Sequence, residues 1–203
     1  MQYWQLDVFA ERPLAGNGLA VFDDARGLSA SAMQGLTQEL RQFESIFLLS
    51  GATADTFSAR IFTVEEELPF AGHPLIGAAP LLHHLHSPAE HADWHLQLTA
   101  KTVQIHTQRL AQGFYAEMDQ GVAEFGAQLS MAQAAAFTSA FGLDHDEQDL
   151  RYPATVVSTG LPYVLLPVTG AGLAKAKQQR ALDLELLACG AAFVFLLDID
   201  ARE

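Results

Sequence analysis

Apolar and polar residues alternate over many short stretches of this chain, and that period of two predicts β-strands. The predicted strands cover residues 1–9, 19–22, 44–49, 57–63, 94–99, 102–108, 113–118, 155–158, 163–168 and 191–197. Helical spacing replaces the alternation in a few places only. The predicted helices cover residues 29–42, 75–85, 130–141 and 182–188. Many strands with few helices predict an α+β fold.

The alternation loosens around residues 119–126, which predicts a boundary between two lobes, 1–118 and 119–203. Ser29 is a suitable N-cap for the first helix, and Ser130 opens the helix that follows the boundary. The second lobe has fewer predicted elements and resembles the first half of a lobe. We therefore expect it to be truncated.

The charge balance narrows the classes of partner. The 24 acidic and 11 basic residues give a formal net charge of −13, which argues against binding to nucleic acid or to an anionic membrane surface. One cysteine, Cys189, allows no disulfide within the chain. No leader is visible, and the apolar run 191–197 is too short to span a bilayer. These features predict a cytoplasmic protein.

The segment Phe70-Ala71-Gly72-His73-Pro74 carries the most specific chemistry. Pro74 precedes an apolar helical stretch, and proline is favoured at the first position of a helix. Gly72 allows the backbone to approach a ligand closely. His73 would then lie at a helix N-terminus, where unpaired N–H groups and the helix dipole attract an anion. The segment predicts a binding site for a small acid, although His73 could equally be a structural cap.

Glu44 is the candidate acid/base. It lies at a helix-to-strand junction beside Phe43, Ile46 and Phe47. A carboxylate in apolar surroundings is suited to taking up a proton and returning it near neutral pH. The alternative is a glutamate that faces solvent or pairs with Arg41.

The remaining candidates are weaker. His83, His84, His86, His91 and His95 cluster in sequence, but the sequence shows no HExxH motif and no cysteine partner, so a solvated helix end is expected and no metal site. The segment Gly170-Ala171-Gly172 lacks the spacing of a nucleotide loop and is expected to be a connector. Cys189 has apolar neighbours, which favours a place in the core.

Several segments together resemble the phenazine-biosynthesis PhzF-like family, which is related in fold to the diaminopimelate epimerases. The matching segments are Asp7-Val8-Phe9, Gly16-Asn17, Glu44-Ser45-Ile46-Phe47, Arg60-Ile61-Phe62-Thr63, Glu67 to Pro74 and Thr159-Gly160-Leu161-Pro162. The resemblance is strong to about residue 80 and thinner beyond it.

The resemblance implies two lobes, each a curved sheet around a central helix, with the active site in the cleft between them. It implies that Glu44 is the acid/base and that His73 and Gly72 contact the substrate. The reaction of the best-known members is isomerisation of trans-2,3-dihydro-3-hydroxyanthranilate without cofactor or metal. We therefore expect a small carboxylate as substrate and a homodimer as the assembly.

Several departures from the family pattern matter. The motif of the type Glu-Asp-x-Ala-Thr-Gly-Ser-Ala is absent, as is the return strand that completes the first lobe. Pro80 falls inside a predicted helix, and Gly18 stands where the family usually has proline. We expect such a chain to self-associate and to be weakly active or inactive alone. A non-catalytic binding module is the main alternative; a two-cysteine racemase is disfavoured because Cys189 lies outside both expected positions.

Overall fold

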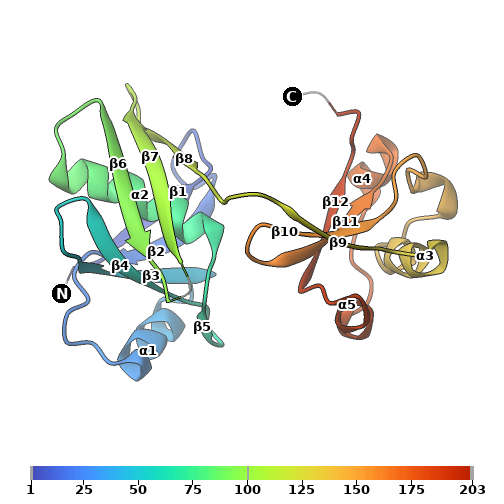
Figure 1. The fold of residues 1–203 in the computed structure, drawn as a ribbon, viewed down its shortest axis with the longest axis horizontal. Coiled ribbons are helices and arrows are strands. Elements are labelled where there is room, and N and C mark those ends of the chain that lie inside the picture. The colour runs from blue at the N-terminus through green and yellow to red at the C-terminus, as the bar shows by residue number, and fades with distance from the viewer. Residues whose placement is uncertain (1, 100, 202–203) are drawn as a thin grey trace. The chain divides into compact units, whose positions relative to one another are not determined.

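The computed structural model describes residues 2–99 and 101–201 (Figure 1). The chain divides into two compact units, Met1–Asp119 and Gln120–Glu203, called unit 1 and unit 2 below. Each unit has its own hydrophobic core, and each is described by itself.

Unit 1 is built on one large sheet. Its strands are β1 (Trp4–Val8), β2 (Asn17–Phe22), β3 (Glu44–Ser50), β4 (Thr56–Phe62), β5 (Glu67–Leu68), β6 (His91–Gln97), β7 (Thr102–Arg109) and β8 (Phe114–Met118). The strand order is β1-β2-β3-β4-β6-β7-β8, and β5 pairs with β4. The pairs β2/β3 and β4/β6 are parallel and the other pairs are antiparallel. The helices are α1 (Ala30–Leu40) and α2 (Gly72–His86).

Both faces of this sheet are apolar and covered along β2 and β3, whereas the outward-facing residues of β6 and β7 are mostly exposed. Along β2, Leu19 and Val21 belong to the core that includes α2, while Ala20 and Phe22 belong to the core beneath α1. The helix α2 packs against β1, β2 and β3 and also against β6, β7 and β8, so the sheet curls around it (Figure 1). A curved sheet around a central helix is the architecture that the resemblance to the PhzF-like family implies for the first lobe.

Helix α1 begins where the sequence predicts and ends earlier. The hydroxyl of Ser29 accepts a hydrogen bond from the amide of Ala32 at 3.2 Å, which confirms the N-cap. The predicted helix extends to residue 42, but the observed helix ends at Leu40. Arg41 adopts a left-handed conformation with φ of 52°, and its N–H bonds to the carbonyl of Thr37. This conformation at the C-cap turns the chain out of the helix before β3.

Helix α2 begins at Gly72, three residues before the predicted range 75–85 and two before Pro74, so Pro74 occupies the third position. The N–H groups of the first turn have no acceptor within the helix, so a proline there removes no hydrogen bond. Pro80 does lie inside the helix, where proline costs about 3 kcal/mol. Burial of Leu75 and Leu82, both fully buried, favours the helix nevertheless.

The expectation of a solvated histidine cluster is wrong for His83, which is fully buried. Its Nδ1 lies 2.8 Å from the hydroxyl of Thr107, and its Nε2 lies 2.9 Å from the carbonyl oxygen of Ala89. The indole N–H of Trp94 donates to the same hydroxyl at 3.0 Å. Since a carbonyl oxygen only accepts, a proton on Nε2 fits the contact with Ala89. The Thr107 hydroxyl also lies 3.0 Å from the carbonyl oxygen of Ala92, so its single proton can go either to that oxygen or to Nδ1. The single sequence gives no sign of this network because its members come from three separate elements.

Replacing His83 by leucine is expected to lower the free energy of unfolding by about 1–3 kcal/mol, because it removes two buried hydrogen bonds. His84→Leu is the matched control, since His84 is the exposed neighbour on the same helix. That substitution should stay within about 0.5 kcal/mol. Urea unfolding of both variants measures the difference. Equal effects at the two positions would contradict the structural role assigned to His83.

Unit 2 has a smaller sheet, with β9 (Glu124–Gln128), β10 (Thr155–Ser158), β11 (Pro162–Pro167) and β12 (Phe193–Leu197) in the order β12-β11-β10-β9. Its helices are α3 (Met131–Ala140), the 3-10 helix η1 (His145–Glu147), α4 (Gly170–Lys175) and α5 (Asp183–Cys189). Helices α3 and α5 pack on one sheet face, where the core contains Phe137, Val164 and Leu166.

Two elements of unit 2 depart from the sequence-based prediction. Strand β9 lies in the stretch where the alternation loosens; all five of its residues are exposed, so it has no buried side to create an alternating pattern. The segment Gly170-Ala171-Gly172 begins α4 and is not a connector. The hydroxyl of Thr169 accepts from the amide of Gly172 at 3.1 Å and caps that helix.

Candidate active site

Glu44 and His73 meet within unit 1. Oε2 of Glu44 lies 2.5 Å from Nδ1 of His73, although the two groups do not have the alignment of a hydrogen bond. Both side chains are nearly buried, at 7% and 9% exposure. Glu44 therefore neither faces solvent nor pairs with Arg41 among the described contacts. In the sequence, β4 and β5 lie between the strand that begins with Glu44 and the helix that contains His73, and the fold brings the two residues together.

The sheet and α2 position the pair. Glu44 is the first residue of β3, where it is in register with Leu19 of the parallel strand β2. His73 is the second residue of α2, which lies against this sheet. The residues after Glu44 are Ser45, Ile46 and Phe47, and all three are fully buried. Packing of β3 therefore holds the carboxylate at a strand end, directly beside the start of the helix.

The environment of the pair is apolar and lacks further partners. Oε2 of Glu44 and Nε2 of His73 are buried atoms without a hydrogen-bond partner among the described residues. The ring of Phe43 lies 6.4 Å from the ring of His73, centroid to centroid, yet Phe43 itself is 71% exposed. Sequence reasoning expects Phe43 to bury Glu44. The structure places Phe43 at the surface, because the residue before a strand lies outside the sheet.

The start of α2 has the properties of an anion site. Its N-cap, Ala71, has no side chain that could bond to the first-turn amides. Pro74 has no N–H, which leaves the amides of Gly72 and His73 as the donors of this turn without an intrahelical acceptor. A Cβ placed on Gly72 would lie 3.6 Å from Cε of Met118, an ordinary contact distance. Packing against the described residues therefore does not require a glycine at this position.

The 2.5 Å contact places a side chain that can donate a proton beside one that can accept it. A pair of this kind can hold a proton on either atom and pass it on. The neighbouring helix N-terminus favours a negative charge close by. The arrangement can thus bind an anion and move a proton beside it.

A cavity of about 540 Å³ in unit 1 lies elsewhere, and its lining includes neither Glu44 nor His73. Its lining comes from β1, α2 and β8 and includes Trp4, Leu6, Ile76, Pro80, Phe114 and Ala116. The strands β1 and β8 are the two ends of the sheet order. Most of its lining is apolar, and Asp7, His84 and Tyr115 also line it. None of the described contacts joins these three as Glu44 and His73 are joined, so we do not assign the chemistry to this cavity.

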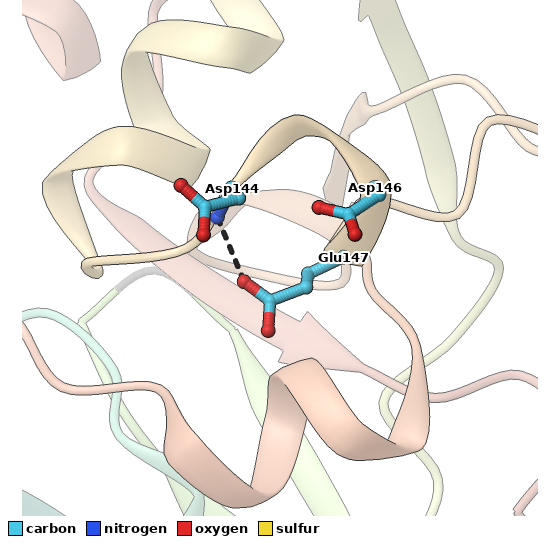
Figure 2. A group of neighbouring side chains, drawn as sticks. All are labelled: Asp144, Asp146 and Glu147. Atoms are coloured by element: carbon cyan, nitrogen blue, oxygen red, sulfur yellow. Dashed lines mark hydrogen bonds between the residues drawn. The ribbon is translucent and has the colours of Figure 1, made fainter.

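A cluster of acidic groups in unit 2 has a structural explanation. Asp144, Asp146 and Glu147 lie around the short helix η1 (Figure 2). One carboxylate oxygen of Glu147 accepts from the amide of Asp144 at 2.7 Å, and the other lies 2.5 Å from Nζ of Lys175. The hydrogen bond from Lys175 lowers the pKa of the Glu147 carboxyl. These contacts account for the cluster without a metal ion.

The remaining sequence candidates do not join the pair. Cys189 ends α5 in unit 2, packs beside that unit's core and is half-buried. His91 and His106 stack on one another at the surface of the sheet, with centroids 5.6 Å apart. Among residues 2–99 and 101–201, no helix combines the length and apolar character needed to cross a membrane.

Unit 1 is an α+β unit whose sheet curls around a helix, and a buried carboxylate–imidazole pair lies at the start of that helix. These two features define a class of acid/base site. Comparison with known proteins identifies the family. A family model described as phenazine biosynthesis-like protein, PhzC-PhzF, matches residues 6–200. The chain belongs to this family.

Several of the named relatives are isomerases. The chain is 34% identical over 168 residues to an uncharacterized isomerase of Mesorhizobium japonicum, covering 82% of this chain and 55% of the relative. It is 47% identical over 77 residues to the trans-2,3-dihydro-3-hydroxyanthranilate isomerase of Pseudomonas chlororaphis, covering 38% of this chain and 28% of that enzyme. The chain thus spans about half or less of the length of these relatives.

Solved structures agree with the fold. A predicted epimerase from Pseudomonas aeruginosa is 58% identical with a TM-score of 0.92, and the match covers 98% of this chain and 70% of that one. A PhzF-family protein from Bacillus anthracis shares the fold at a TM-score of 0.82 with 22% identity, covering 100% of this chain and 69% of that one. These matches confirm the α+β fold and the family that the sequence motifs indicate.

Proposed function

We propose that this chain carries the acid/base half of an isomerase that shifts a proton within a small carboxylate substrate. The buried contact between Glu44 and His73, at the unsatisfied N-terminus of α2, is the observation that supports it. The names of the relatives support the same reaction class.

In this proposal Glu44 is the group that moves the proton. Its carboxylate takes a proton from one carbon of the substrate, and the electron pair of that C–H bond moves into the adjacent unsaturated system. Glu44 then returns a proton to another carbon of the same system, so that atoms and charge balance without an oxidant or reductant. Only this chain's own side chains take part in the proton transfer.

His73 and Gly72 bind the substrate. The amides of Gly72 and His73 are suited to a carboxylate, because helix N-termini bind anions through N–H groups and the helix dipole. Nε2 of His73 has no partner in the structure and is available to a hydroxyl or amino group of the ligand. Since Nε2 is shielded from solvent, ligand entry requires a side chain to move. Phe43 is the exposed ring nearest to His73 among the described aromatic contacts.

The preferred substrate is an amino- or hydroxy-substituted cyclic carboxylate, as in the dihydro-hydroxyanthranilate named for the relatives. It combines a carboxylate for the helix N-terminus with a polar hydrogen-bonding group for His73. A non-catalytic binding module would use the same two contacts and would differ only in the absence of turnover.

Anthranilate should therefore raise the melting temperature of the chain, and aniline, which lacks the carboxylate, should not. The expected rise follows from preferential binding to the folded state. Differential scanning fluorimetry over a range of ligand concentrations measures it. His73→Ala should abolish the anthranilate shift, while His84→Ala, on the exposed side of the same helix, should keep it.

No stabilisation by anthranilate or by other cyclic carboxylates would contradict the anion site. If anthranilate still stabilises the His73→Ala variant, its binding site does not lie at the start of α2. Binding without any turnover of a dihydro-hydroxyanthranilate would instead support the binding module over the isomerase.

A further inference from the structure

Strands β6 and β7 present an outward face that is rich in histidine. Along both strands, residues buried in the core with α2 alternate with residues on the other side of the sheet. The outward positions include His91, Asp93 and His95 on β6 and His106 on β7. The sequence alone assigns His91 and His95 to a solvated helix end, but the structure places both in a strand. The pairing of β6 with β7 then adds a histidine from the neighbouring strand.

His106 is the centre of this face. In the register of the sheet it lies opposite Asp93 of β6 and opposite Glu117 of β8. Its Nδ1 is 3.0 Å from Oδ1 of Asp93, and the ring of His91 stacks on its ring with the centroids 5.6 Å apart. Two imidazoles and two carboxylates thus gather on the outer side of strands that run side by side (Figure 1).

The contact with Asp93 prepares His106 as a metal ligand. A carboxylate only accepts hydrogen bonds, so in the neutral imidazole Nδ1 carries the proton and Nε2 keeps its lone pair. Metal-binding histidines commonly donate their other ring N–H to a carboxylate in this way, which fixes the orientation of the ring and strengthens the ligand. His106 therefore has one nitrogen anchored to the protein and one that faces away from that anchor.

His91 can supply a second nitrogen after a small rotation. Two nitrogen ligands of one zinc ion lie about 3–4 Å apart, since each Zn–N bond is about 2.0–2.1 Å long. The rings of His91 and His106 are 5.6 Å apart between centroids, and their side chains are 51% and 46% exposed. Exposed side chains change rotamer quickly, so both rings can turn toward one ion without any movement of the strands.

The charges around the two rings favour a cation. Asp93 and Glu117 flank His106, and Oε1 of Glu90 lies 3.8 Å from Nε2 of His91. The chain as a whole has a formal net charge of −13. Carboxylates beside the two neutral imidazoles offset the charge of a divalent ion, and the negative field of the chain raises its local concentration.

We propose that this face of unit 1 binds a divalent transition-metal ion, with Nε2 of His106 and a ring nitrogen of His91 as the protein ligands. Imidazole suits zinc, copper and nickel, whereas magnesium and calcium prefer oxygen ligands. Water completes the coordination in this proposal, since the face is open to solvent. The ion joins β6 to β7 on the side of the sheet away from α2, so it takes no part in the proton transfer assigned to Glu44.

Isothermal titration of the unsubstituted chain with zinc chloride, without a histidine tag, tests the proposal. We expect saturation by a single zinc ion at micromolar concentration. The melting temperature should rise as well, because the ion binds the folded pairing of β6 and β7. Magnesium chloride should give neither signal. Equal binding of magnesium would mean that the acidic surface attracts any divalent cation, and would overturn the proposal.

Histidine substitutions locate the ion. His106→Ala and His91→Ala should each weaken zinc binding at least about tenfold, because each removes a ligand. His95→Ala is the matched control: His95 lies on the same strand and the same face, where its Nδ1 is 3.9 Å from Oδ2 of Asp55. That variant should bind zinc as tightly as the unsubstituted chain.

Far-UV circular dichroism shows whether each variant is folded, and we expect no change because all three histidines lie at the surface. A chain that binds no zinc would overturn the proposal. Zinc binding that is unchanged in both His91→Ala and His106→Ala would overturn it too, and would favour the acidic cluster of Asp144, Asp146 and Glu147 as the site. An equal loss in His95→Ala would show that His91 and His106 are not the ligand pair, with the same consequence.

Discussion

Glu44→Gln is expected to lower the isomerisation rate at least about a hundredfold, the lower end of the contribution of general acid–base catalysis. Glutamine preserves the shape of the side chain but cannot take up and return the proton. Since Glu44 lies at a strand end beside His73 and not within the packed centre of the core, the fold should remain intact.

The measurement is turnover of a dihydro-hydroxyanthranilate, or incorporation of solvent deuterium into it, which also reports proton transfer that is too slow for a turnover assay. Glu39→Gln is the matched control: it removes an equal charge from the exposed surface of α1, five residues earlier. Its rate should equal that of the unsubstituted chain. A Glu44→Gln variant with full rate would exclude Glu44 as the acid/base.

A pair of glycine substitutions should shift stability in opposite directions. A Cβ at Gly77 in α2 would lie 2.6 Å from Cδ2 of Leu19 and 2.6 Å from Cγ2 of Val8. Both neighbours are buried core residues, and overpacking of this kind typically costs about 1–3 kcal/mol. That cost exceeds the gain of about 0.5–1 kcal/mol from replacing glycine by alanine within a helix. Gly77→Ala is expected to destabilise unit 1.

Gly35 is the control, because it also lies inside a helix, α1, and a Cβ there would meet no atom within 4 Å. Gly35→Ala should therefore stabilise the chain by about 0.5–1 kcal/mol. The urea unfolding midpoints of the two variants measure whether Gly77→Ala lowers the stability and Gly35→Ala raises it. Stabilisation by both would show that β1 and β2 do not lie against α2 as closely as the structure indicates.

The motif at the start of α2 shows which features of the structure can be predicted from neighbouring residues alone. Proline and glycine restrict or free the backbone in known ways, so the helix start and an exposed turn of amides follow from residues 70–74 alone. The helix starts at Gly72, two residues before Pro74, because proline is tolerated anywhere in the first turn. Ser29 and Ser130 could be recognised as caps for the same reason: a capping hydroxyl acts within its own turn.

His83 and strand β9 mark the limit of such reasoning. The environment of His83 is formed by Thr107, Trp94 and Ala89, and the pairing of β6 with β7 brings the first two together. A pattern of neighbouring residues in the sequence cannot predict a contact that forms only when two strands pair. All five residues of β9 are exposed, so neither side of the strand has to be apolar. Its sequence therefore need not alternate between apolar and polar residues.

The sequence by itself determined the α+β class, the position of most strands and helices, and the two residues that deserved a chemical hypothesis, because periodicity, caps and short motifs are local properties of a chain. Only the tertiary structure decided that Glu44 and His73 lie 2.5 Å apart. It also decided that His83 is a core residue and that β6 and β7 bring His91 and His106 onto one exposed face. Each of these depends on which strands pair and which helix covers which face, and long-range packing sets that choice.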